Sequence, residues 1–164
     1  MKVQIELQNK TSFIVDLPIT MKLCEFFTLE ELANNKGNPA LPQFIINKEV
    51  DIYLAMLSEF RRWFAKPMKI TSCYRQPAYN DSLPNADKRS AHKHACAGDW
   101  WIQGHTNSQR NNVKNKWESL CNKYGVIGAV NFYTDGYHLE IFTDKWYGKK
   151  TFQVRDYRGK KGDW

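Results

Sequence analysis

Apolar and polar side chains recur at regular intervals along the chain, and these intervals predict its secondary structure. Residues 2–7 and 12–16 alternate between polar and apolar side chains, which predicts two short strands. A helix is predicted over 47–65, because apolar residues there form one stripe at helical spacing: Tyr53, Met56, Leu57, Phe60, Trp63 and Phe64. A second helix fits 107–123, where apolar side chains again fall on one face.

Capping residues and chain breakers predict the remaining elements. Thr28 and Glu31 have the spacing of a capping box, so a short helix is expected to begin there. Pro67 is expected to end the long helix. Apolar runs then predict strands over 68–72, 96–102, 126–133 and 137–142. Together these elements predict an α+β fold, in which a small antiparallel sheet has helices packed on one side.

Composition and charge favour a folded protein with an anionic partner. The chain has 164 residues, of which 42% are apolar, so we expect one domain with a hydrophobic core over 1–164. No apolar run approaches the roughly 20 residues that span a bilayer. The first residues lack the apolar core of a secretory signal, so synthesis in the cytoplasm is expected. The formal net charge of +7 suits a nucleic acid, a membrane surface or an anionic cell wall.

The cysteines give no sign of a structural cross-link. Cys24, Cys73, Cys96 and Cys121 are far apart and form no CxxC pair. This spacing argues against both a cysteine-rich zinc module and a disulfide framework. Reduced, mostly buried thiols are the expected state.

The C-terminal segment 144–164 is basic and aromatic, with seven Lys or Arg residues against three Asp. Its aromatic residues are Trp146, Tyr147, Phe152, Tyr157 and Trp164. Basic and aromatic side chains together can bind a sugar polymer or a nucleic acid. The simpler alternative is a final strand near 152–154 that is followed by a solvated end.

Two histidines and two aspartates form the most informative pattern. His92, Asp99 and His138 offer two imidazoles and one carboxylate, a set that holds zinc and leaves its fourth position open to water. Asp135, three residues before His138, could take a proton from that water. Seven residues extend about 10.5 Å in a helix and about 23 Å in a strand. The chain between His92 and Asp99 must therefore bend back, and the small residues in 94–98 permit this.

Other assignments stay open at this point. His94 competes with His92 for the first ligand position, and His105 in a polar turn is expected to be exposed. The pair Asp135-Gly136 is also what a two-residue hairpin requires.

The order of these residues resembles the zinc D-Ala-D-Ala carboxypeptidase family. That family includes phage L-alanyl-D-glutamate endolysins and the vancomycin-resistance D-Ala-D-Ala dipeptidases, and its fold is shared with the hedgehog signalling domain. The resemblance covers about 25–142 and leaves 143–164 as a basic aromatic extension. The motifs that carry it are Ser72-Cys73-Tyr74-Arg75, Asn80, Ser90-x-His92-x6-Asp99 and Asp135-x-x-His138-x-Glu140.

The resemblance implies a role for each matching residue. His92, Asp99 and His138 match the three zinc ligands, and Asp135 matches the catalytic carboxylate. The remaining three matches are Arg75, which contacts substrate and steadies the oxyanion, Ser90, which can hydrogen-bond the substrate, and Glu140, which supports the ligand shell.

Three departures from the family pattern concern backbone geometry and substrate size. Cys73 and Ala95 stand where relatives usually have glycine. Trp100-Trp101, directly after Asp99, is bulkier than usual. None of these changes removes a ligand or the catalytic carboxylate.

The implied function is zinc-dependent hydrolysis of an amide bond in peptidoglycan stem peptides. We expect a monomeric phage-type endolysin or wall-remodelling enzyme that acts at the cell wall after release or as a virion component, with no nucleic-acid partner. Carboxypeptidase, dipeptidase and endopeptidase relatives share these residues, so the bond that is cut stays open. The alternatives are a non-catalytic zinc-containing module of the same fold and a nucleic-acid-binding protein that uses 144–164.

Overall fold

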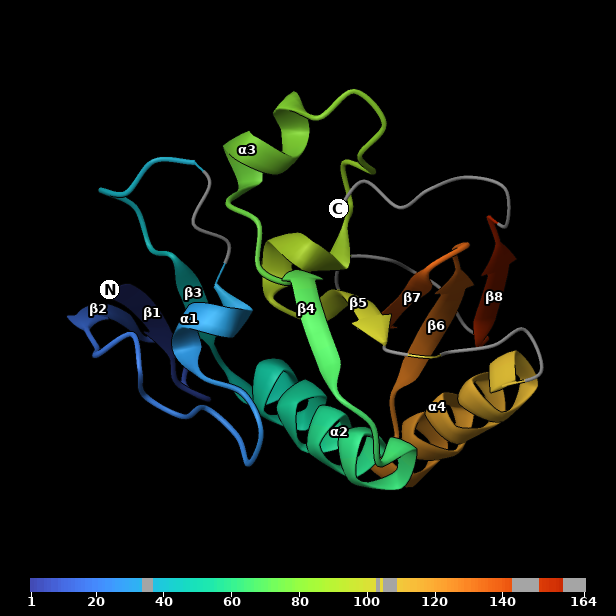
Figure 1. Cartoon of the computed structure of the whole chain (residues 1–164). Coiled ribbons are helices and arrows are strands. Elements are labelled where there is room, and N and C mark those ends of the chain that lie inside the picture. Colours follow the sequence, from blue (N-terminus) through green and yellow to red (C-terminus); the bar gives the residue numbers. More distant parts are fainter. Residues whose placement is uncertain (34–36, 103, 105–108, 143–150, 158–164) are drawn as a thin grey trace.

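The computed structural model describes residues 1–33, 37–102, 104, 109–142 and 151–157, which form an α+β fold with two sheets (Figure 1). The smaller sheet has the strand order β2-β1-β3, with β1 at Lys2–Glu6, β2 at Ser12–Asp16 and β3 at Phe44–Ile46. The larger sheet has the order β4-β5-β7-β6-β8, with β4 at Met68–Ser72, β5 at Ala97–Ile102, β6 at Ile127–Phe132, β7 at Gly136–Phe142 and β8 at Gln153–Asp156.

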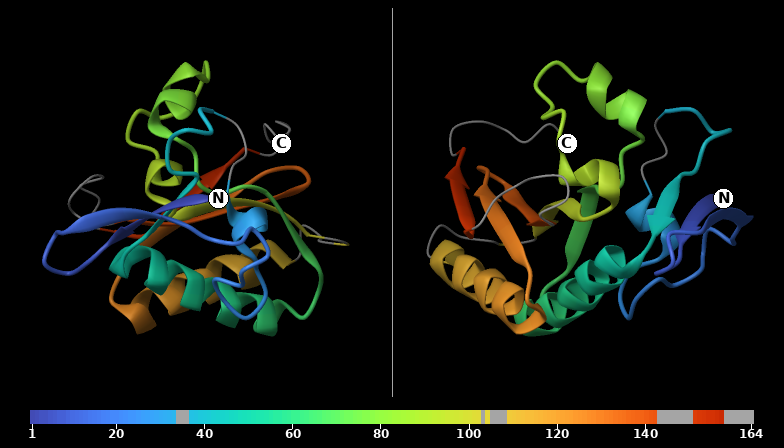
Figure 2. Two further views of the ribbon diagram at one scale, coloured as in Figure 1. Left: turned by 90° about the vertical axis from the view of Figure 1, so that its left-hand side faces the viewer. Right: turned by 180° about the vertical axis from the view of Figure 1, so that it is seen from behind.

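The helices lie on both sides of the larger sheet. They are α1 (Leu29–Leu32), α2 (Lys48–Phe64), α3 (Pro77–Ser82), α4 (Arg110–Tyr124) and the 3-10 helix η1 (Ala91–His94). The two long helices, α2 and α4, cover one face, whereas α3 and the chain around η1 lie on the opposite side (Figure 2).

The sequence correctly predicts the α+β class, but the prediction of one antiparallel sheet with helices packed on one side is wrong in three respects. The helices lie on both sides of the larger sheet rather than on one (Figure 2). The described strands form two sheets rather than one. Each sheet also contains a parallel pair, β1 with β3 and β6 with β8. Apolar periodicity marks where a strand lies, but it carries no information about the direction of the neighbouring strand, because both directions bury the same face.

Local signals fix the helix ends as expected. Thr28 and Glu31 form the predicted capping box, in which each side chain accepts a hydrogen bond from the backbone N–H of the other residue. At the start of α2, the Asn47 side chain accepts from the N–H of Val50 at 3.0 Å. Helix α2 ends at Phe64, and its C-cap residue Ala65 adopts a left-handed conformation with φ of 56°.

One apolar cluster extends from Val3 in the smaller sheet to Ile141 in the larger one, so the two sheets share a core. Helix α2 is tied to β7 by the Tyr53 hydroxyl, which donates to the carbonyl of Leu139 at 3.0 Å. Helix α4 is tied to β7 by the Trp117 indole, which donates to a β7 carbonyl at 3.1 Å. No helix among the described residues is both long and apolar enough to cross a membrane.

Candidate metal centre

A row of polar residues crosses the larger sheet on the face opposite α2 and α4. The strand register places Ser72 beside Asp99, Asp99 beside His138, and His138 beside Asn131. Asn131 is in turn beside Arg155 on β8. Residues directly opposite one another on paired strands share a face. The sheet therefore brings Asp99 and His138 together, although 39 positions separate them in the chain.

The third member, His92, reaches this face from η1. The Ser90 hydroxyl accepts from the backbone N–H of His92 at 3.3 Å, which starts the short helix. The helix stops at Ala95, whose φ of 55° is left-handed, and the chain turns directly into β5. This turn is the bend that the spacing of His92 and Asp99 requires.

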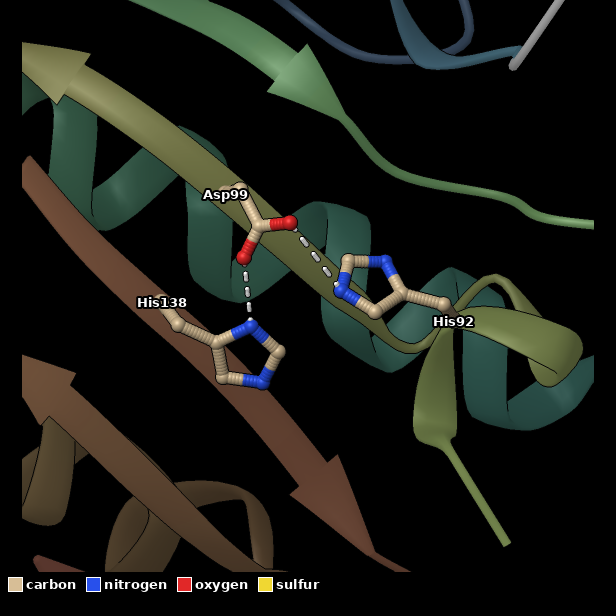
Figure 3. Close-up of side chains that lie close together, drawn as sticks. All are labelled: His92, Asp99 and His138. Atoms are coloured by element: carbon tan, nitrogen blue, oxygen red, sulfur yellow. Dashed lines mark hydrogen bonds and ion pairs between the residues drawn. The ribbon is translucent and has the colours of Figure 1, made fainter. Parts of the chain in front are cut away.

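The three side chains meet around the Asp99 carboxylate (Figure 3). Its Oδ1 lies 2.7 Å from Nδ1 of His138, and its Oδ2 lies 3.3 Å from Nε2 of His92. One ligand atom from each residue lies within 4.8 Å of the other two. All three side chains are at most 9% exposed. Ligands about 2 Å from zinc are about 3.3 Å apart in a tetrahedron, so this buried group can hold a metal ion after a small adjustment.

Neighbouring groups contact one nitrogen of each imidazole, and the other nitrogen faces the Asp99 carboxylate, where a cation could bind. Nδ1 of His92 lies 2.6 Å from the carbonyl oxygen of Cys73, an acceptor, so this nitrogen carries the proton and Nε2 keeps its lone pair. Nε2 of His138 lies 3.1 Å from Oε2 of Glu140. If Nε2 donates to that carboxylate, the lone pair of His138 is on Nδ1, which faces Asp99. Two nitrogens and one oxygen suit zinc and other divalent first-row metals.

The same contacts shift the ionisation of the group. Burial lowers the pKa of His92, despite the opposing charge of Asp99, and so favours the neutral ligand form. Burial alone would also lower the pKa of His138, but the carboxylates of Glu140 and Asp99 outweigh it and raise that pKa to about 9. A metal ion that binds Nδ1 of His138 must therefore displace the proton on that nitrogen. Burial would raise the pKa of Asp99, but the two imidazoles hold it well below its usual range.

Arg75 lies against the cluster. Its Nη2 donates to Oδ2 of Asp99 at 2.8 Å, and its Nε donates to the Ser72 hydroxyl at 2.8 Å. The side chain is 14% exposed. A guanidinium has five N–H donors. These two contacts therefore leave Arg75 with donors that can hydrogen-bond a bound molecule.

The other candidate residues lie in different surroundings. His94 is half buried on η1 and does not belong to the metal-binding group, whereas His92 does. Asp135 is half buried in the bend before β7, and its role as a proton acceptor stays a prediction. The hydroxyl of Ser90 caps η1, and its contact with a substrate also stays a prediction. His105 lies outside the described residues, so its expected exposure is untested.

The structure shows the surroundings of the three departures from the family pattern. Ala95 adopts the left-handed conformation that favours glycine. Cys73 is buried, and its carbonyl orients His92. Trp100 is fully buried in the core, whereas Trp101 on the opposite face of β5 is 40% exposed.

Arg155 also lies on this face, which the sequence pattern does not predict, because the composition of 143–164 is typical of a basic extension. Its Nη1 lies 3.4 Å from Oε1 of Glu140. The alternative strand near 152–154 ends one residue before Arg155. If its alternation is continued by one residue, Arg155 falls on the same face as Gln153.

The chain matches no protein-family model, no curated protein and no solved structure. A function can therefore be inferred only from the residues and their geometry.

Proposed function

We propose that this protein is a zinc-dependent peptidase that hydrolyses an amide bond in peptidoglycan stem peptides, with a fold like that of the hedgehog domain and the D-Ala-D-Ala carboxypeptidases. The observation that carries this proposal is the buried convergence of His92, Asp99 and His138 on one face of the sheet. The motif resemblance, which includes residues that a purely structural metal site would not need, supports hydrolysis.

The residues divide the chemistry between them. A bound zinc ion would supply Lewis acidity and lower the pKa of a coordinated water toward about 7. His92, Asp99 and His138 would hold the ion. Asp135 would accept the proton of the attacking water on a carboxylate oxygen and deliver it to the nitrogen of the leaving amine.

Arg75 would orient the substrate and steady the negative charge that develops on the carbonyl oxygen. Its contact with Asp99 supports this role, because that contact fixes the guanidinium beside the candidate ligands. A charge placed in advance near the reacting atoms costs no reorganisation during the reaction.

The charge of the chain supports peptidoglycan as the substrate. Stem peptides are rich in carboxylates, and the protein carries a formal net charge of +7. The bond is either the L-alanyl-D-glutamate bond or the terminal D-Ala-D-Ala bond. The shape of the surface around the proposed site would decide between the two.

Digestion of purified peptidoglycan by the zinc-loaded protein, followed by mass spectrometry of the fragments, tests the proposal. Release of a free D-Ala indicates a carboxypeptidase, whereas cleavage after L-Ala indicates an endopeptidase. Asp135→Asn should retain zinc and lose the activity, because an amide cannot accept the proton.

Two results would contradict the proposal. Full activity in zinc-loaded Asp135→Asn would rule out the assigned proton acceptor. Stoichiometric zinc binding by the natural chain, without hydrolysis of any stem peptide, would favour the non-catalytic zinc module instead.

A further inference from the structure

Strand β8 belongs to the same sheet as the candidate metal centre, although its sequence looks like part of a solvated basic extension. It pairs in parallel with β6, and Arg155 is the register partner of Asn131. Asn131 is in turn the partner of His138. Arg155 therefore stands two strands away from His138 on the same face of the sheet.

Glu140 connects these two residues. Its Oε2 lies 3.1 Å from Nε2 of His138, and its Oε1 lies 3.4 Å from Nη1 of Arg155. The Glu140 side chain is 5% exposed, whereas that of Arg155 is 31% exposed. The register partners of Glu140 on either side are Ala97 and Ala129, whose methyl groups offer no hydrogen bond. The carboxylate is therefore held at one oxygen by the imidazole and at the other by the guanidinium.

We propose that Arg155 is a positioning residue of the metal centre, which orients His138 through Glu140. This inference rests on the proposed metal site but not on peptidase activity. An imidazole that ligates a metal through Nδ1 is neutral, so it cannot supply the counter-charge that a buried carboxylate needs. Arg155 supplies that counter-charge and restricts the rotation of the carboxylate. Glu140 can then keep the Nε2–H of His138 in place and Nδ1 directed toward Asp99.

The test uses the full chain and three variants. Arg155→Gln removes the charge, and Arg155→Lys keeps the charge but loses the planar fork. Arg62→Gln is the matched control, because Arg62 pairs with Glu25 at 2.7 Å in an exposed ion pair on α2. Zinc affinity is measured by competition with a chromogenic chelator. The geometry of the site is followed by the visible absorption spectrum of the cobalt(II)-substituted protein.

Arg155→Gln should weaken zinc binding by about 10-fold to 100-fold, the usual effect of losing a group that supports a ligand. It should also change the cobalt spectrum, which a merely structural role would leave alone. Arg155→Lys should recover part of the affinity, and Arg62→Gln should match the natural chain. Combining Arg155→Gln with Glu140→Gln should weaken binding little more than Glu140→Gln does alone, since both changes break the same connection.

Unchanged zinc affinity and an unchanged cobalt spectrum in Arg155→Gln would overturn the inference. Fully additive losses in the double variant would also overturn it, because Arg155 would then act by another route. Zinc binding without hydrolysis would defeat the peptidase proposal and leave this one standing. A natural chain that binds neither zinc nor cobalt would defeat both.

Discussion

The two faces of the five-stranded sheet are built from alternate residues of the same strands, yet they have opposite chemistry. On the face toward α2, a Cβ added at Gly98 would lie 2.6 Å from the Trp100 indole nitrogen and 2.8 Å from the Tyr53 hydroxyl. On the other face, the intervening residue Asp99 contacts two imidazoles and a guanidinium. A shift of one residue in register would exchange these two environments.

The difference between the two faces shows how a buried polar cluster can lie next to an apolar core. The apolar face supplies stability through packing, which requires only shape and volume. The polar face has a charged partner for each carboxylate, Arg75 for Asp99 and Arg155 for Glu140. Even a paired buried charge contributes little net stability, because desolvation offsets the attraction. We therefore expect the metal-binding face to depend on the stability of the opposite face.

Trp100→Ala should have the largest effect on the fold. Trp100 is fully buried and packs on Phe27 at a ring-centroid distance of 5.0 Å. Its truncation should lower the free energy of unfolding by about 3–5 kcal/mol. Urea denaturation measures this loss, and zinc titration of the remaining folded protein should give an affinity near that of the natural chain. A loss of stability below about 1 kcal/mol would show that this face is not the source of stability.

His138→Gln should show the reverse pattern, with a large loss of zinc affinity and a smaller change in stability. The neighbouring carboxylates keep their arginine partners in this variant, so the fold should survive. Zinc affinity should fall by more than about 100-fold, since loss of a ligand exceeds the 10-fold to 100-fold effect of losing a supporting group. Unfolding in the presence of a chelator provides the control. Retention of full zinc affinity would remove His138 from the ligand set.

The polar face should make stability depend on pH when metal is removed by a chelator. The pKa of His138 is raised to about 9 in the fold, above the value of about 6.5 of an unfolded histidine. The folded state therefore binds the proton more tightly, and stability must fall as pH rises between these two values. Urea midpoints from pH 6 to 10 measure this fall. His138→Gln should flatten the profile over that window, and an identical profile in both proteins would contradict the assignment.

The two alanines with left-handed backbone give the smallest expected effect. Ala65 ends α2 and is exposed, so Ala65→Gly should stabilise the fold by about 1 kcal/mol by removing steric strain. Ala95 has a similar φ but is fully buried beside η1. Ala95→Gly should gain much less, because loss of a buried methyl costs about 0.8 kcal/mol. Urea denaturation of both variants compares them, and equal gains would show that burial at Ala95 contributes nothing.

Local sequence signals predicted most helices and strands correctly. The capping box at Thr28 and Glu31 and the apolar stripe of 47–65 each depend on residues within a few positions of one another, so the sequence contains the whole signal. Strand β3 was not predicted, because three residues are too few to show an alternation of apolar and polar side chains. The parallel direction of β8 was not predicted either, since it depends on the tertiary structure rather than on local sequence.

The sequence alone determined which residues could bind a cation, because only a few imidazoles and carboxylates occur at suitable places in the motifs. It also showed that the chain must bend between His92 and Asp99 and that the small residues there permit this bend. Only the tertiary structure decided that His92 rather than His94 joins the group, and that Arg155 reaches Glu140. Those contacts join strands and turns far apart in the chain, and their distances follow from register and packing rather than from spacing along the sequence.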